Sequence, residues 1–278
     1  MTDTDSDAGS KMPLLEHLVE LRRRLMWSVV AFVACFIIAF YFASPVFNFI
    51  AQPLVDLWAE EGQTGRFIYT AVQEKFVTDL KIGFFVGAFF AFPMIAIQVW
   101  LFVAPGLYKN EKRAFLPFLI ATPVLFFVGS AFVYYFVLPP AWSFFADYQQ
   151  AAEGTNAAIV LEPKVDQYLS FVVRLIFAFG ISFELPVILT LLARIGIIST
   201  VGMRKNRRYA ILIAFVVAAI LTPPDPISQL GLAIPIILLY EISILCAQLV
   251  EKRRAAEAAK EAEDDPDDDS AGDDEVPA

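Results

Sequence analysis

Long apolar runs dominate the chain and alternate with short, charged polar segments. Six runs reach or approach the length of a membrane span, at about 25–43, 77–103, 115–138, 167–193, 208–222 and 227–248. A bilayer core about 30 Å thick needs roughly 20 apolar residues in a helix. The runs are continuous and lack the short alternating pattern of membrane β-strands. The pattern therefore predicts an all-α membrane protein with six transmembrane helices, of which the fifth is the shortest.

The composition agrees with this pattern. The chain has 278 residues, is 58% hydrophobic and has a mean hydropathy of +0.62, whereas a soluble domain of this length is more polar. The net charge of −9 comes from the C-terminal end, because residues 255–278 hold eleven acids and one base. We therefore expect a disordered segment at 1–13, a transmembrane domain at 14–250 and an acidic, disordered cytoplasmic tail at 251–278.

The basic residues predict an orientation. With both termini in the cytoplasm, the cytoplasmic segments hold most of the 21 lysines and arginines. The five exceptions are Arg66, Lys75, Lys81, Lys164 and Arg174. Because cytoplasmic loops carry an excess of Lys and Arg, this bias indicates a multi-pass protein with both termini cytoplasmic.

The segments between the runs differ in their expected structure. Pro45–Trp58, in the first outer loop at about 44–76, has the pattern of a short amphipathic helix that is kinked or restarted at Pro53. The second outer loop, at about 139–166, opens with two prolines, and the third, Thr222–Pro226, predicts a tight turn. Gly83 and Gly87 form a GxxxG pattern, which is weak evidence for a helix-packing face.

Two carboxylates at the predicted cytoplasmic face are candidate binding residues. Glu111 lies among Lys109, Lys112 and Arg113, and Glu20 directly precedes a run of three arginines. One interpretation is structural, with Glu111 in a surface pair and Glu20 paired with Arg24 one helical turn later. The other is a receptor for a guanidinium, which a carboxylate binds in a bidentate fork. Sequence spacing does not show whether the two acids approach each other.

A third acid, Glu184, lies inside the fourth apolar run, two residues before Pro186. Acids inside a membrane are costly and usually face a bundle interior or water. The alternatives are a structural acid bonded to a neighbouring helix and a functional acid. With Arg174, Glu184 would suit an intramembrane relay in a small-solute or ion transporter. Gln98 and Gln229 are candidates for hydrogen bonds between helices.

Signatures of enzymes are missing. His17 is the only histidine, so a histidine-based zinc site or catalytic triad is implausible. The chain has no phosphate-binding GxxxxGK[ST] loop and no G-x-S-x-G nucleophile turn. We therefore expect no catalytic residue, no metal and no cofactor, and we expect energy to come from a partner or from the proton gradient.

Four motifs, in this order, resemble the TatC family, the multispanning receptor of twin-arginine protein translocases. They are His17–Leu25, Gln98–Arg113, Phe179–Pro186 and Leu221–Asp225, and the likeness runs from about residue 14 to 248. The resemblance implies a cup-shaped bundle of six helices in the cell inner (plasma) membrane. It also implies binding of signal peptides that carry consecutive arginines, export of folded proteins driven by the proton gradient, and no nucleic-acid partner.

Site residues follow from the resemblance by position. It implies that Glu20 and Glu111 bind the twin arginines and that Arg22 and Phe102 belong to the neighbouring surface. The remaining implied positions concern partner docking and are Glu184, Pro53 and Asp225. The implied partners are small single-span subunits of the TatA and TatB type, the lipid bilayer, and further copies of the chain within a receptor complex.

Overall fold

The computed structural model describes residues 8–60, 62, 65–103, 112–150, 162–222 and 226–264. Nearly all of these residues are helical, and the β-structure within them is one isolated bridge between Ile68 and Lys164. The predicted all-α class is therefore confirmed.

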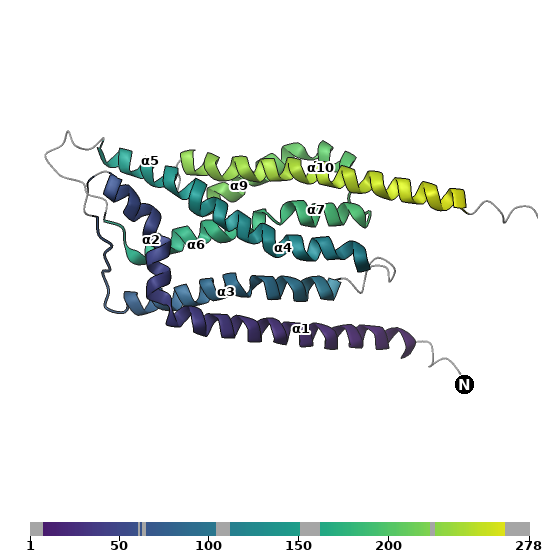
Figure 1. Ribbon diagram of the computed structural model, residues 1–278, viewed down its shortest axis with the longest axis horizontal. Helices are drawn as coiled ribbons and strands as arrows, with labels where there is room; N and C mark the ends of the chain where they lie inside the picture. Colours follow the sequence, from purple (N-terminus) through teal and green to yellow (C-terminus); the bar gives the residue numbers. More distant parts are fainter. Residues whose placement is uncertain are drawn as a thin grey trace, which may run out of the picture.

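The helices run largely along one direction, and one short helix crosses them at an end (Figure 1). In chain order the elements are α1 (Ala8–Tyr41), α2 (Ala43–Glu60), α3 (Glu74–Val103), α4 (Lys112–Phe132), the π-helix η2 (Val133–Val137), α5 (Leu138–Gln150), α6 (Val165–Ser182), α7 (Leu185–Arg194), α8 (Thr200–Lys205), α9 (Arg207–Leu221) and α10 (Pro226–Asp264). The crossing helix is α2. The start of α1 and the end of α10 both lie at the end of the bundle opposite α2, as a protein with both termini on one side requires.

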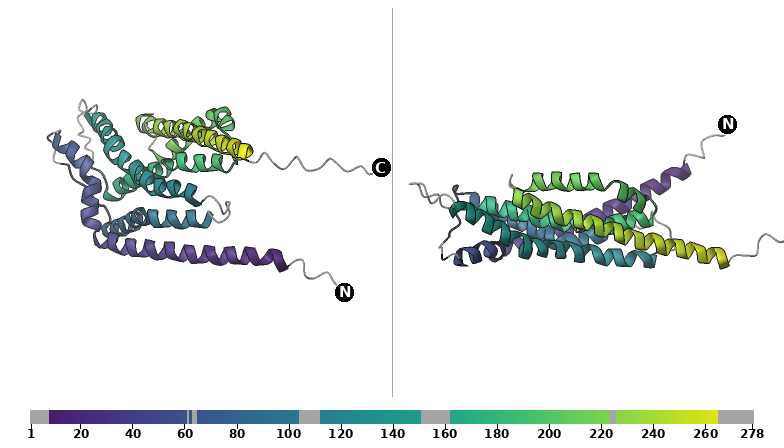
Figure 2. Two further views of the ribbon diagram at one scale, coloured as in Figure 1. Left: turned by 45° about the vertical axis from the view of Figure 1, so that its right-hand side comes forward. Right: turned by 90° about the horizontal axis from the view of Figure 1, so that it is seen from above.

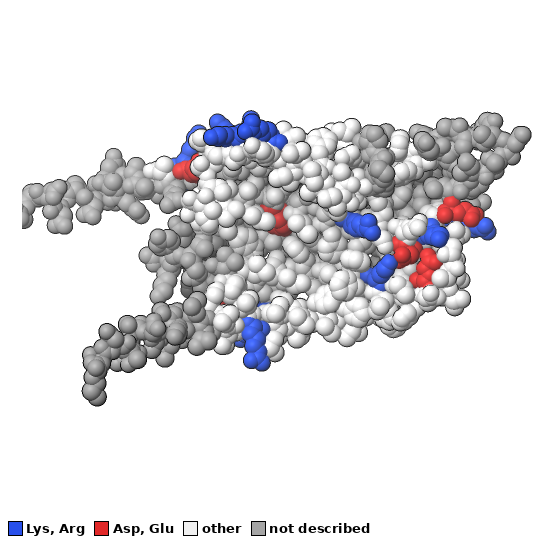
Figure 3. Space-filling model, turned by 180° about the vertical axis from the view of Figure 1, so that it is seen from behind, with Lys and Arg blue, Asp and Glu red and all other residues white. Residues whose placement is uncertain are grey.

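Five stretches within the described residues are long and apolar enough to cross a bilayer. They are His17–Tyr41, Glu74–Phe102, Pro117–Ala146, Val165–Arg194 and Gln229–Arg253. The remaining predicted span, 208–222, corresponds to α9, whose 15 residues reach only about 22 Å. On the face in Figure 3, most charged side chains of the described residues gather toward the two ends of the molecule. The structure is therefore that of a multi-pass membrane protein, and the sixth span stays a prediction.

Several boundaries differ from the expected ones. Helix α1 already begins at Ala8 and α10 continues to Asp264, because residues 251–264 are mostly Ala, Glu, Lys and Arg, which favour helices.

The third span also continues past residue 138, through α5, where a loop was expected. A wide π-turn, in which the Leu138 N–H bonds to the Val133 carbonyl, immediately precedes Pro139 and Pro140, whose missing N–H groups interrupt a regular helix.

Helix α1 packs along α3 and makes few other contacts with the described helices (Figure 2). The two glycines of the GxxxG pattern make this packing close. A Cβ atom on Gly87 would lie 2.7 Å from the Phe36 Cα atom, and one on Gly83 would lie 2.9 Å from the Phe40 Cβ atom. The pattern therefore marks a real helix-packing face between α1 and α3.

Candidate functional site

Glu20 lies on α1 and is held by the next helical turn. Arg24 donates to its Oε1 atom from Nε at 2.9 Å and from a terminal nitrogen at 2.5 Å. The predicted Glu20–Arg24 pair is therefore confirmed. Both bonds use the same oxygen, and within the described part of the chain no donor bonds to Oε2. The side chain of Glu20 keeps 27% of its surface exposed, so the side chain is not fully enclosed.

Two side-chain contacts join this part of α1 to the last turns of α3. Arg24 also donates to the Gln98 side-chain oxygen at 3.3 Å, which confirms Gln98 as a hydrogen-bonding residue between helices. The rings of His17 and Phe102 stack with their centroids 4.3 Å apart and 18° between their planes. Arg22 is exposed on α1. The structure thus brings Glu20 and Phe102 to the same end of the α1–α3 pair.

Two predicted site residues, Glu111 and Asp225, lie outside the described residues. Glu111 directly precedes Lys112, where α4 begins, and Asp225 directly precedes Pro226, where α10 begins. Their roles stay predictions.

Glu184 lies at the break between α6 and α7, where Pro186 occupies the first turn of α7. The helix restarts at this proline because Pro suits a helix start better than a helix interior. Glu184 is only 6% exposed. Its Oε1 atom has no hydrogen-bond partner among the described residues, and an unpaired buried polar atom is costly.

A polar side chain from α4 lies beside Glu184. The hydroxyl of Thr122, on α4, interacts with its carboxyl group. The same hydroxyl accepts a hydrogen bond from the Trp100 indole on α3 at 2.9 Å. The sequence did not single out Trp100 or Thr122, because each lies in an apolar run and only the fold brings these side chains of α3 and α4 together.

The remaining candidates lie elsewhere. Pro53 is inside α2, and Gln229 donates to the Phe215 carbonyl of α9 at 3.4 Å, as expected for a bond between helices.

Arg174 lines an apolar groove whose lining does not include Glu184. The ten residues between them span about 15 Å of helix, so the two side chains do not form a direct relay pair. Within the described residues, no cluster of three or more His, Cys, Asp or Glu side chains could hold a metal ion.

Comparisons with known proteins decide the family. A family model described as Sec-independent protein translocase protein (TatC) matches residues 16–235. The chain belongs to the TatC family. A relative from Magnetococcus marinus, the Sec-independent protein translocase protein TatC, is 48% identical over 97% of this chain and 96% of its own length. The TatC protein of Escherichia coli is 41% identical over 84% of this chain and 86% of its own.

A crystal structure described as that of the twin-arginine translocase receptor TatC has the same fold. It superposes with a TM-score of 0.73 at 40% identity and covers 84% of this chain and 99% of its own. This TatC-family chain is therefore a component of Sec-independent protein translocation and a multi-pass membrane protein, and it is not an enzyme. The family assignment favours protein transport over the small-solute transporter.

Proposed function

We propose that this chain is the receptor subunit of a twin-arginine translocase and binds the twin-Arg signal peptides of folded proteins at the cytoplasmic face of the inner membrane. The observation that carries the proposal is the carboxylate of Glu20. It is fixed on a helix by Arg24, it is partly exposed, and its Oε2 atom is free of donors from the described residues.

The neighbourhood of Glu20 suits a guanidinium ligand. The stacked His17 and Phe102 rings add an apolar surface beside the carboxylate, and partial exclusion of water strengthens a charge-assisted hydrogen bond. Glu111 supplies the second carboxylate and Arg22 belongs to the surrounding surface. Such a site should prefer arginine to lysine, because the planar guanidinium binds a carboxylate through two hydrogen bonds whereas the lysine ammonium binds as a point charge.

Binding of a fluorescent twin-Arg signal peptide to the purified chain tests this proposal. Replacing Glu20 with Gln keeps the shape of the side chain and removes its charge. We expect affinity to fall about tenfold to a hundredfold, the range for losing a hydrogen bond to a charged group. The matched control is Glu162→Gln, because Glu162 is also exposed and paired with an arginine, Arg66, but lies before α6. Equal binding by the Glu20 variant and the wild type would contradict the proposal.

The second part of the proposal concerns partners. Single-span subunits of the TatA and TatB type dock near Glu184. Pro53 and Asp225 contribute to partner contacts on the outer side of the membrane. Glu184 is buried, and its Oε1 atom has no hydrogen-bond partner in the part of the chain that the structure describes. This supports the role, because a donor on a partner helix would satisfy that oxygen. A folded cargo is too large to thread through one bundle, so the chain acts as a docking platform that self-associates with further copies. The proton gradient drives export through the protonation of Glu184.

A further inference from the structure

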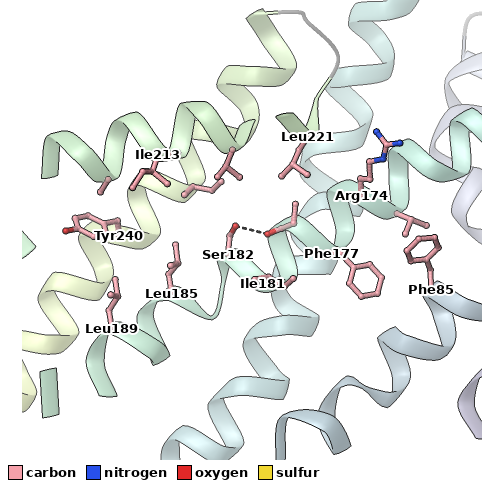
Figure 4. Close-up of a pocket in the computed structure, with 16 residues that line it drawn as sticks. Phe85, Arg174, Phe177, Ile181, Ser182, Leu185, Leu189, Ile213, Leu221 and Tyr240 are labelled. Atoms are coloured by element: carbon pink, nitrogen blue, oxygen red, sulfur yellow. Dashed lines mark hydrogen bonds between the residues drawn. The ribbon is translucent and has the colours of Figure 1, made fainter. Parts of the chain in front are cut away.

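An apolar groove of about 650 Å³ opens on the side of the bundle formed by α6, α7, α9 and α10. Figure 4 shows Arg174 at one end of the groove and Tyr240 and Leu189 at the other. Between these ends the lining is almost entirely aliphatic or aromatic, for example Phe177 and Ile213. A long, thin apolar ligand with a charged end would match this arrangement.

Arg174 is the charged end of the groove. It lies in the apolar span Val165–Arg194 and is exposed, and within the described part of the chain it has no ion-pair partner. The acid nearest to it along α6 toward the α2 end, Asp166, is already bound to Lys81 at 2.5 Å. Intramembrane charges normally pair with an opposite charge or mark a ligand site. An unpaired guanidinium at the end of an apolar groove therefore favours an anionic ligand.

The depth of Arg174 suits a lipid headgroup. It lies nine residues after the start of α6 at Val165, which is about 13 Å along the helix. Arginine side chains extend toward the membrane surface, and the bilayer thins and admits water around them, so a phosphate group can meet the guanidinium from that side. The guanidinium fork matches two phosphate oxygens.

We propose that this groove binds an anionic phospholipid, with the phosphate on Arg174 and an acyl chain along the apolar wall toward Tyr240. The size of the groove favours a lipid over a protein helix. Its volume lies within the range of small-molecule sites, about 300–1,000 Å³. A spanning helix of roughly 20 residues, about 10–12 Å across, occupies more than about 2,000 Å³ and would cover the opening instead of filling the groove.

Native mass spectrometry of the purified full-length chain tests this proposal. Phosphatidylglycerol and phosphatidylcholine with identical acyl chains are added in turn, and the lipid that stays bound is quantified. We expect one phosphatidylglycerol to be retained about tenfold more tightly than phosphatidylcholine, whose choline cation opposes Arg174. Arg174→Gln should remove this preference, while the matched control Arg66→Gln, an exposed arginine outside the groove, should keep it.

A second variant tests the groove itself. Ala210 lines it and is half-buried, so Ala210→Phe should fill part of the space and weaken retention of both lipids. Unchanged lipid retention in Arg174→Gln would overturn the proposal. If that variant instead lost a copurifying single-span protein, Arg174 would be a helix-docking residue, which also overturns it. Should Arg174→Gln fail to fold, unchanged retention in Ala210→Phe would overturn it as well.

Discussion

The hydroxyl group of Tyr134 donates a hydrogen bond to the backbone carbonyl of Phe49 at 2.7 Å, and the two rings stack 4.7 Å apart with 4° between their planes. In a regular helix this carbonyl would accept from the residue four positions later. That residue is Pro53, which has no N–H group. The next carbonyl, of Ile50, accepts from the Tyr168 hydroxyl at 2.9 Å. Two tyrosines from other elements thus stabilise α2 around its proline.

Removing one of these hydroxyls should therefore destabilise the protein. Tyr134→Phe leaves the Phe49 carbonyl without its donor, and we expect a loss of about 1–3 kcal/mol in the free energy of unfolding. In a Pro53→Ala background, the new backbone N–H group can donate within the helix, so the same Tyr134 change should cost less. Thermal unfolding of the four proteins in detergent forms a double-mutant cycle. If Tyr134→Phe lowered the stability equally in the wild-type and Pro53→Ala backgrounds, the tyrosine would not compensate for the N–H group that the proline lacks.

The close contact between α1 and α3 makes a second prediction. Gly87→Ala places a methyl group 2.7 Å from the backbone of Phe36, which cannot move as a side chain can, so α1 must shift. We expect a destabilisation of about 1–3 kcal/mol together with weaker binding of the signal peptide, because the α1–α3 contact positions Glu20 beside Phe102. The matched control is Gly231→Ala, where the added Cβ atom would meet no described atom within 4 Å apart from its own helix backbone and chain neighbours. Similar losses in both variants would contradict this account.

Glu184 should stabilise the fold less than an apolar residue would. Glu184→Leu removes a buried carboxyl group whose Oε1 atom finds no partner in the described part of the chain, so we expect the melting temperature to rise while export of a reporter protein falls. Thr190→Val is the matched control, because its hydroxyl is also buried and unpaired among the described residues. It should raise the melting temperature and leave export unchanged. Normal export of the reporter by the Glu184→Leu variant would contradict a role of Glu184 in export.

Signal-peptide binding should depend on salt. Raising the ionic strength from about 0.1 M to 1 M shortens the screening length from about 10 Å to 3 Å. Glu20 is partly exposed, so its attraction for an incoming guanidinium should weaken over this range. The Glu20→Gln variant lacks that attraction, and its affinity should fall less. Peptide affinity is measured by fluorescence anisotropy at each salt concentration. If the affinities of the wild type and the variant fell equally with salt, the result would argue against a contact with Glu20.

The sequence was sufficient for features that depend on neighbours along the chain. The spans appeared as apolar runs, the Glu20–Arg24 pair as a four-residue spacing, and α2 as an amphipathic pattern interrupted by Pro53. The bond from Tyr134 to Phe49 joins residues 85 positions apart, and no periodicity marks it. Helix α5 was missed for a related reason, because two prolines locally predict a loop and only the preceding π-turn accommodates them within a helix.

The most direct test of the receptor compares two peptides and two proteins. Affinities of a twin-Arg signal peptide and its Lys-Lys counterpart are measured for the wild type and for Glu111→Ala. Because only arginine offers a bidentate fork, we expect the wild type to prefer the Arg-Arg peptide strongly and Glu111→Ala to lose most of that preference. Equal binding of both peptides, unaffected by Glu111→Ala, would contradict a guanidinium receptor at this face.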